Sequence, residues 1–253
     1  MIIRNEKELD AMKRIGRIVA NVLQEMAAAT VEWITTRELD QICAAALTRY
    51  GAISAPMSEY NFPGYSCISV NDEIAHGIPG ERVLRPGDMV NLDVSASYAG
   101  YFADSGVTIL LPPEDKVGKR LIAASKKTLE NSIAQAVAGR RLSMVSKATE
   151  ETAKSFGFKT IRNLCGHGVG HTLHDQPEMI NNYYDPHDTR VMAEGMALAI
   201  ETFVAEKENH VIEDKKNGWT LRTPKGSRAV QFEHTVIVTK GKPIILTLPG
   251  EVE

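Results

Sequence analysis

Acidic residues stand inside stretches that otherwise read as buried β-strands. Asp93 lies between Leu92 and Val94, and Asp104 follows beyond an expected turn. If residues 98–100 form that turn, the two carboxylates lie opposite each other or within about two residues of register, close enough for contact across a hairpin. Two like charges that close require a cation or a raised pKa. For an arbitrary pair of strand aspartates, exposed acids beside a turn would be the default interpretation.

Glu201 and Glu233 pose the same problem more sharply. Glu201 follows the apolar run 197–200 and precedes Phe203, and Glu233 interrupts the apolar segment 230–238. A bare carboxylate in such a strand would be costly to bury. Each one alone could be a paired or edge-strand acid. Four strand carboxylates of the same kind are most simply explained by a shared metal.

Histidines could add a nitrogen ligand and proton carriers. His167 lies in the glycine-rich segment 165–170, where glycine lets the backbone approach a ligand closely. His174 follows seven residues later, and His76 precedes Gly77. A lone His–Gly pair more often marks a turn than a ligand. Structural or surface roles are the default for His171, His187, His210 and His234.

Four carboxylates and one imidazole form a hard, oxygen-rich ligand set. Such a set suits Mn, Fe, Co or Zn in a dinuclear cluster and is a poor match to a thiolate-rich structural zinc site. Two such ions can bridge a water or hydroxide, lower the pKa of the water, and stabilise the oxyanion that develops on a carbonyl substrate. The pattern therefore predicts metal-dependent hydrolysis.

Helices and strands that would position these residues follow from hydrophobic spacing. Apolar residues at steps of three and four predict a helix over 6–28. Thr35 and Glu38 have capping-box spacing, so a second helix is expected from there to Gly51. Strands are expected over residues 67–70, 89–94 and 101–109.

The same order then recurs later in the chain, which indicates a weak internal duplication. We expect one α/β (α+β) domain over residues 1–253, with pseudo-two-fold symmetry, a curved antiparallel sheet in the middle and two pairs of helices outside. The active site is expected where the halves meet. The polar stretch 206–216 is expected to be a surface loop or hairpin tip. The second set of elements covers residues 115–138, 143–156, 197–204 and 230–239.

Composition excludes several classes of protein. The chain has 253 residues, 43% hydrophobic and 24% charged, without an apolar stretch of membrane-spanning length, so no membrane span is expected. Its N-terminus is charged throughout, which argues against a secretory signal and favours the cytoplasm. A net charge of -3 without a large Lys/Arg cluster argues against a nucleic-acid partner. Cys43, Cys67 and Cys165 form no CxxC pair and are expected to be reduced thiols.

Taken together, the motifs strongly resemble those of type I methionine aminopeptidases, which have the creatinase-like "pita-bread" fold. The resemblance extends over nearly the whole chain. It rests on segments 69–79 (SVNDEIAHGIP), 91–94 (NLDV) with Asp104, 165–170 (CGHGVG) with His174, 199–201 (AIE) and 231–235 (QFEHT).

The resemblance implies a role for each metal ligand. Asp93 and Asp104 would hold one divalent ion, and Asp104 with Glu233 would bridge to a second ion that His167 and Glu201 complete. Glu201 would also carry a proton from the attacking water. The reaction implied is removal of the initiator methionine from nascent polypeptides, with a preference for a small second residue and a requirement for a free amine.

The resemblance also implies a substrate site. His174 would position the substrate and stabilise the oxyanion, and His76 would assist the leaving nitrogen. The resemblance implies a methionine pocket lined by aromatic rings and a thiol, which suit a thioether side chain. For each aromatic residue, the alternative is ordinary packing in the core. Segment 59–64 could be shifted by one residue relative to many relatives. The pocket maps onto Tyr60, Phe62, Cys67, His76 and Trp219.

Two departures and two alternatives complete the expectations. Many relatives have proline where this chain has Thr202 and phenylalanine where it has Leu173, both expected beside the site. A proline-directed peptidase of the same superfamily would share the ligands but usually has a separate N-terminal domain. A metal-free binding module would typically lack several ligands, and metal content would identify it. Transient ribosome association and a monomeric state are expected.

Overall fold

The first half of the chain places two helices against a long β-hairpin. The computed structural model describes residues 1–252. Helices α1 (Glu6–Ala29) and α2 (Thr36–Tyr50) precede β4 (Met89–Tyr98) and β5 (Tyr101–Leu110). The apolar stripe of α1 packs on β4 and β5, and the Thr35 capping box and the left-handed Gly51 bound α2 as predicted.

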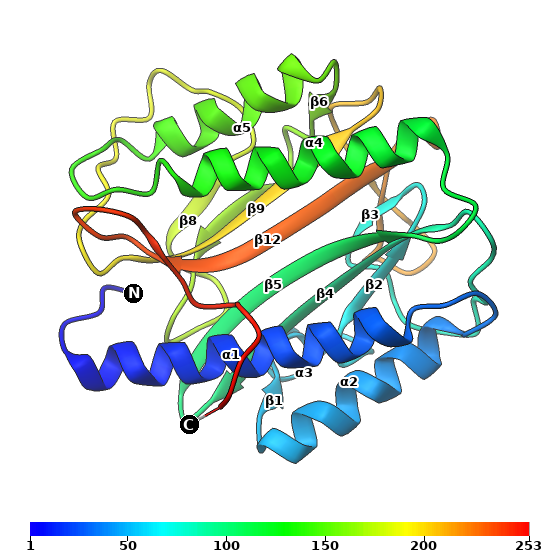
Figure 1. Ribbon diagram of the computed structural model, residues 1–253, viewed down its shortest axis with the longest axis horizontal. Helices are drawn as coiled ribbons and strands as arrows, with labels where there is room; N and C mark the ends of the chain where they lie inside the picture. Colours follow the sequence, from blue (N-terminus) through cyan, green and yellow to red (C-terminus); the bar gives the residue numbers. More distant parts are fainter. Residues whose placement is uncertain (253) are drawn as a thin grey trace.

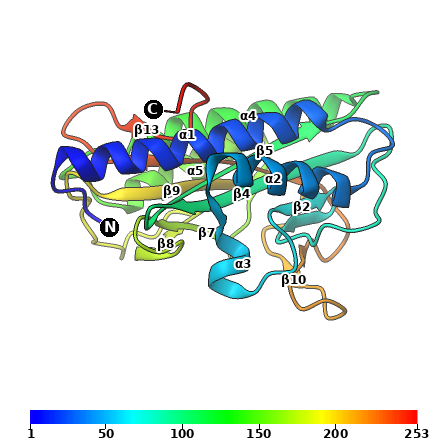
Figure 2. The ribbon, with the colours of Figure 1, turned by 90° about the horizontal axis from the view of Figure 1, so that it is seen from below.

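The second half repeats this arrangement. Helices α4 (Lys116–Ile133) and α5 (Ser143–Ser155) pack near β9 (Ala197–Ala205) and β12 (Ala229–Ile237). Figure 1 shows the two helix pairs on either side of a central run of strands, and Figure 2 shows α1 and α4 on one side of the strands and α3, β8 and β10 on the other. The predicted mixed α/β fold with two similar halves is confirmed.

Backbone hydrogen bonds group the strands into three sheets. One has the order β1-β4-β2 with β5 on β4, one has β13-β12-β9-β7-β8 with β6 on β9, and a small one has β10-β11-β3. The shorter elements are β1 (Ile53–Ser54), α3 (Ala55–Tyr60), β2 (Cys67–Val70), β3 (Glu73–Ala75), β6 (Lys159–Thr160), β7 (Cys165–Gly168), β8 (Asp175–Asn181), β10 (Ile212–Glu213), β11 (Leu221–Arg222) and β13 (Ile244–Ile245).

The β4–β5 turn is fixed by local chemistry. Ala99 and Gly100 both have positive φ, 51° and 82°, as a two-residue type I′ turn requires. The resulting register pairs Ser95 with Asp104. Asp93 is therefore two positions from the residue opposite Asp104, within the predicted range.

Side-chain hydroxyls join the two halves where β5 and β12 run side by side. Thr235 Oγ1 accepts a hydrogen bond from the Asp104 amide at 2.9 Å and donates one to the Asp104 carbonyl at 2.8 Å. Thr108 Oγ1 does the same for Gln231, donating to its carbonyl at 2.8 Å and accepting from its amide at 3.1 Å. These hydroxyls satisfy backbone groups that a buried strand edge would leave unpaired.

One predicted helix boundary was wrong, and one short helix was missed. Helix α4 ends at Ile133 rather than 138, because residues 137 and 138 turn to pair with Thr239, next to β12. Helix α3 was not predicted, since its six residues are too few to show a helical period. The polar stretch 206–216 does contain one strand of a small hairpin, β10 paired with β11. No helix within residues 1–252 has the length and apolar character needed to cross a bilayer.

Candidate active site

Five strands deliver the predicted metal ligands to one place. Asp93 comes from β4, Asp104 from β5, His167 from β7, Glu201 from β9 and Glu233 from β12. Glu201 and Glu233 are directly opposite each other in the β9–β12 ladder. His167 pairs with the residue two before Glu201, so strand alternation puts both side chains on one face.

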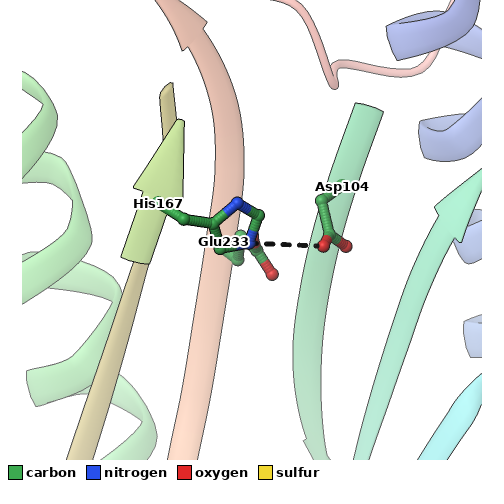
Figure 3. A group of neighbouring side chains, drawn as sticks. All are labelled: Asp104, His167 and Glu233. Carbon is green, nitrogen blue, oxygen red and sulfur yellow. Dashed lines mark ion pairs between the residues drawn. The ribbon is translucent and has the colours of Figure 1, made fainter. Parts of the chain in front are cut away.

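Buried atoms of the ligand type converge at this point. His167 Nε2 lies 3.8 Å from Asp104 Oδ2 and 3.8 Å from Glu201 Oε1. Asp104, His167 and Glu233 each offer an atom within 4.8 Å of the others. Figure 3 shows these three side chains converging, with the His167–Asp104 pair dashed. Their exposed fractions are 7%, 3% and 2%.

The carboxylates of this cluster lack partners inside the protein and suit a divalent cation. Within residues 1–252, Asp104 Oδ1 and Glu233 Oε1 are buried and have no hydrogen-bond partner. In the same part of the chain, no lysine or arginine forms an ion pair with Asp93, Asp104, Glu201 or Glu233. Unpaired buried carboxylate oxygens are costly, and hard metal ions bind such oxygens directly.

Burial raises the pKa of all four carboxyl groups, and the charges of neighbouring carboxylates raise it further in three of them. Burial raises the pKa of Asp93 to about 6. Burial first, and the charges of Glu233 and Asp93 next, raise the pKa of Asp104 well above its ordinary value. Glu201 and Glu233 have raised pKa values for the same reasons, burial and then neighbouring carboxylates. A bound cation would favour the ionised forms.

His167 is held in the tautomer that a metal requires. Its Nδ1 lies 2.9 Å from the Gly168 carbonyl oxygen. A carbonyl can only accept, so Nδ1 carries the proton and Nε2 presents a lone pair to the carboxylate cluster. Burial also lowers the pKa of His167 to about 3, which keeps the imidazole neutral near pH 7.

A cavity of about 240 Å³ opens beside the carboxylates. Glu233 does not line it but lies buried behind it, opposite Glu201. Thr202, expected beside the site, does not line it either: its side chain is buried on the other face of β9, donating to the Phe232 carbonyl at 3.3 Å. The cavity is lined by Pro56, Tyr60, Phe62, Cys67, His76, Asp93, Ser95, Asp104, His167, Leu173, His174, Glu201 and Trp219.

Two histidines face this cavity. His174 Nδ1 lies 2.5 Å from the Tyr60 hydroxyl, and its ring is 4.2 Å from the ring of His167. His76 has a left-handed backbone, with φ at 55°, directly after β3. Desolvation lowers the pKa of both His174 and His76, so both are neutral near pH 7.

The apolar part of the wall comes from three separate segments. Phe62 follows α3, and its ring meets that of Trp219 edge to face at 5.3 Å. Cys67 on β2 is opposite Asp93 in register, and burial raises the pKa of its thiol well above the ordinary value. Within residues 1–252 it is a free cysteine, as are Cys43 and Cys165, as predicted. Aromatic rings and a buried thiol suit an apolar, polarisable side chain.

Sequence reasoning missed the groups that support the ligands. Ser95 lies opposite Asp104 and lines the cavity. Asn91 and Gln231 are each two residues before a ligand, Asp93 and Glu233, and are buried beside the cluster. The signal was present, because residues i and i+2 of a strand share a face.

Comparison with known proteins identifies the family of the chain. The model of metallopeptidase family M24 matches residues 10–240. The chain is 42% identical to methionine aminopeptidase 2 of Bacillus subtilis (strain 168), covering 98% of this chain and 99% of the relative. It is 44% identical to a methionine aminopeptidase of Staphylococcus epidermidis, with 98% of each chain covered.

Solved structures give the same answer. The crystal structure of methionine aminopeptidase from Thermotoga maritima has a TM-score of 0.94 and 36% identity, covering 98% of this chain and 100% of that chain. A prolidase from Pyrococcus horikoshii has a TM-score of 0.77 at 20% identity, and this chain covers 64% of it, a likeness of fold alone. The family model spans nearly the whole length of the chain, and it confirms the resemblance of the motifs. The chain therefore belongs to metallopeptidase family M24.

Proposed function

We propose that this chain is a methionine aminopeptidase that removes the N-terminal methionine from new polypeptides by means of two divalent metal ions. One observation carries the proposal: a cluster of buried carboxylates, which no lysine or arginine within residues 1–252 neutralises, borders a small cavity that Phe62, Cys67 and Trp219 also line. The relatives named methionine aminopeptidase, which match this chain end to end, support the same activity.

Asp93, Asp104, His167, Glu201 and Glu233 would hold the two ions. The orphaned oxygens of Asp104 and Glu233 and the free Nε2 of His167 are the donor atoms that Mn, Fe, Co or Zn would take. When bound, the ions would act as Lewis acids toward the substrate carbonyl and would activate a water for attack. Glu201 lines the cavity, so we assign it the role of holding a proton and passing it to the nitrogen that leaves when the first peptide bond breaks.

His174 and Tyr60 act as a unit in this proposal. The Tyr60 hydroxyl lies 2.5 Å from His174 Nδ1, and we assign the donor role to the hydroxyl, which puts the proton of the neutral ring on Nε2. Nε2–H can then donate a hydrogen bond to the oxygen that gains negative charge during attack. Tyr60 therefore contributes a polar contact as well as lining the pocket.

His76 is assigned to the leaving nitrogen. Its backbone is held in the left-handed region next to a Gly77 whose position leaves no room for a side chain, since a Cβ there would be 2.2 Å from the Ile68 carbonyl. The Thr220 hydroxyl contacts the His76 carbonyl at 3.4 Å. Strained backbone of this kind persists where its surroundings fix it, as at functional sites.

The size and chemistry of the cavity favour methionine. A volume of about 240 Å³ suits one amino-acid residue rather than a longer peptide segment. The rings and thiol contact a thioether favourably, and the carboxylates attract the positive charge of a free N-terminus. A preference for a small second residue belongs to the proposal through the family resemblance.

Release of free amino acids from short peptides tests the function. The metal-free protein is supplied in turn with Mn, Co, Fe or Zn and given Met-Ala-Ser, Met-Leu-Ser or Ala-Pro-Ser. Metal-dependent release of methionine, faster from Met-Ala-Ser than from Met-Leu-Ser, is expected. Cleavage of Ala-Pro-Ser alone would assign the chain to the proline-directed enzymes. No cleavage with any metal would favour a binding module.

Three further points belong to the same proposal. We assign the protein to the cytoplasm, as a monomer that contacts ribosomes transiently to reach new chains. Cell fractionation, sedimentation velocity and co-sedimentation with ribosomes test these points separately. A predominantly dimeric species, for example, would contradict the monomer.

A further inference from the structure

We infer that Gln231 is a positioning residue for the metal-binding carboxylates, acting through a one-way hydrogen-bond relay from Asn91 to Gln231 to Glu233. Asn91 Nδ2 donates to Gln231 Oε1 at 2.7 Å, and Gln231 Nε2 donates to Glu233 Oε2 at 2.9 Å. The three side chains are 5%, 1% and 2% exposed. The inference rests on the metal centre of the proposed function but concerns residues outside the ligand set.

The direction of the relay is determined by its surroundings. The other atoms near Asn91 Nδ2 are acceptors: the Val107 carbonyl at 3.3 Å, Thr108 Oγ1 at 3.3 Å, and the Gln231 carbonyl at 3.4 Å. Thr108 already directs its hydroxyl proton to the Gln231 carbonyl. The side-chain NH₂ group of Asn91 therefore faces these acceptors and Gln231. Because an NH₂ group only donates, Gln231 must turn its side-chain oxygen toward Asn91, and the NH₂ group of Gln231 then faces Glu233.

A glycine makes room for the relay across the join between the halves. A Cβ on Gly106 would lie 2.0 Å from Gln231 Oε1 and 2.5 Å from Nε2. Gly106 is paired with Asp93 in the β4–β5 ladder, so the amide of Gln231 passes over β5 at the level of the metal ligands. The side chain from the second half is thus seated on the first.

The consequence for Glu233 is an asymmetric carboxylate. Oε2 is held by the amide, whereas Oε1 is buried without a partner in residues 1–252. Because one oxygen is held, the free oxygen has a defined direction. Loss of the relay would let the carboxylate rotate, and such supporting partners typically contribute about 10–100-fold to metal affinity.

Calorimetric titration of the metal-free full chain with Mn²⁺ tests the relay. Gln231→Met keeps the length of the side chain and removes its polar atoms, and about 10–100-fold weaker binding is expected. Asn91→Asp replaces the donor with an acceptor, so Gln231 must turn its oxygen toward Glu233; a similar or larger loss is expected. Gly106→Ala should weaken binding by displacing the amide.

Asn182 provides the matched control. It is 1% exposed and its amide makes two backbone contacts, donating to the Leu164 carbonyl at 3.2 Å and accepting from the Phe203 amide at 3.1 Å, with no hydrogen bond to a carboxylate within residues 1–252. Asn182→Leu should lower the melting temperature and leave Mn²⁺ affinity within about twofold of native. An equal loss of affinity in this variant would overturn the inference.

Each remaining outcome separates the inference from the proposed function. If the native protein binds no Mn²⁺, Co²⁺ or Zn²⁺, both the proposed metal centre and the relay are contradicted. If the native protein binds Mn²⁺ and the Gln231→Met variant binds it with the same affinity, only the relay is contradicted. If the variants do not fold, the native protein still decides, because the Gln231 side-chain NH₂ protons should exchange slowly in NMR spectra; fast exchange would overturn the relay.

Discussion

The metal centre and the wall of the neighbouring cavity are built in opposite ways. Every proposed ligand of the centre lies on a strand, and the two glutamates are directly opposite each other. Most of the wall is assembled from a six-residue helix, the loop after it and the turn before β11, with Cys67 added from β2. The centre therefore takes its precision from ladders, and the wall takes its shape from irregular segments.

Polar clamps hold the wall where no ladder does. Asp40 accepts hydrogen bonds from the amides of Tyr65 and Ser66 at 3.1 and 2.8 Å, which fixes the loop after Phe62. Arg222 pairs with Asp72, Glu73 and Asp214 at 3.2, 2.7 and 3.1 Å, which secures the hairpin that carries Trp219. Because the centre and the wall are built differently, we expect substitutions in the centre to affect metal binding and turnover. Substitutions in the wall should mainly affect the affinity for substrate.

Glu233→Ala should have the largest effect. It removes a carboxylate that both ions are proposed to share, so metal and activity should be lost together, with turnover at least about 10³-fold lower, since the metal supplies most of the chemistry. Metal analysis and methionine release measure this. An active variant with its full metal content would show that Glu233 has no bridging role.

His174→Ala should separate catalysis from metal binding. The fold and the metals should persist, while kcat falls by roughly 10², the usual contribution of one electrostatic or general-acid group. Stopped assays and metal analysis on the same sample check it. Loss of metal in this variant would contradict the division between centre and wall.

Tyr60→Phe should sharpen the comparison, because this residue belongs to the wall but contacts His174. Removing only the hydroxyl should lower kcat about tenfold, the equivalent of one hydrogen bond to a reacting group, and change KM little. Phe62→Leu is the matched change in the same wall without a polar contact, and it should raise KM instead. The same KM increase in both variants would deny Tyr60 a role through His174.

Trp219→Leu should change substrate affinity alone. Its ring meets Phe62 at 5.3 Å in the wall, so KM for Met-Ala-Ser should rise several-fold to tenfold as apolar contact is lost, with metal content unchanged. Trp33 is 60% exposed and distant from the cavity lining, so Trp33→Leu is the control. Equal effects of the two changes would remove Trp219 from the substrate site.

The smallest expected effect is a change in the stability of the metal-free protein, which Asp93→Asn reveals in addition to the loss of metal expected for any ligand. The pKa of Asp93 is raised to about 6, so the folded state binds more protons than the unfolded state and native stability falls as pH rises from about 4 through 6. The histidines with lowered pKa act in the opposite sense, and comparing the two proteins cancels them. Denaturation with chelator present should show the variant gaining about 2 kcal/mol at pH 7.5 relative to pH 4. A difference that does not change with pH would contradict the raised pKa.

Local sequence was sufficient for about half of the active-site framework. The stripe of α1, the caps of α2 and the Ala99–Gly100 turn act within a few residues, so the contact of Asp93 with Asp104 could be predicted. The four carboxylates that we propose as metal ligands could also be picked out as a set, because a carboxylate inside an apolar strand is an anomaly wherever the strand pairs.

The sequence by itself therefore determined the long helices and strands, the family and the set of candidate ligands that the proposed function uses. Only the tertiary structure decided which strands pair, how β5 meets β12 through hydroxyls, that α3 brings Tyr60 to His174, and that Gln231 reaches Glu233 over Gly106. The physical reason is the distance along the chain over which each interaction acts. Caps and turns depend on neighbouring residues, whereas strand partners and buried amide contacts depend on side chains far apart in the chain, whose fit no local pattern encodes.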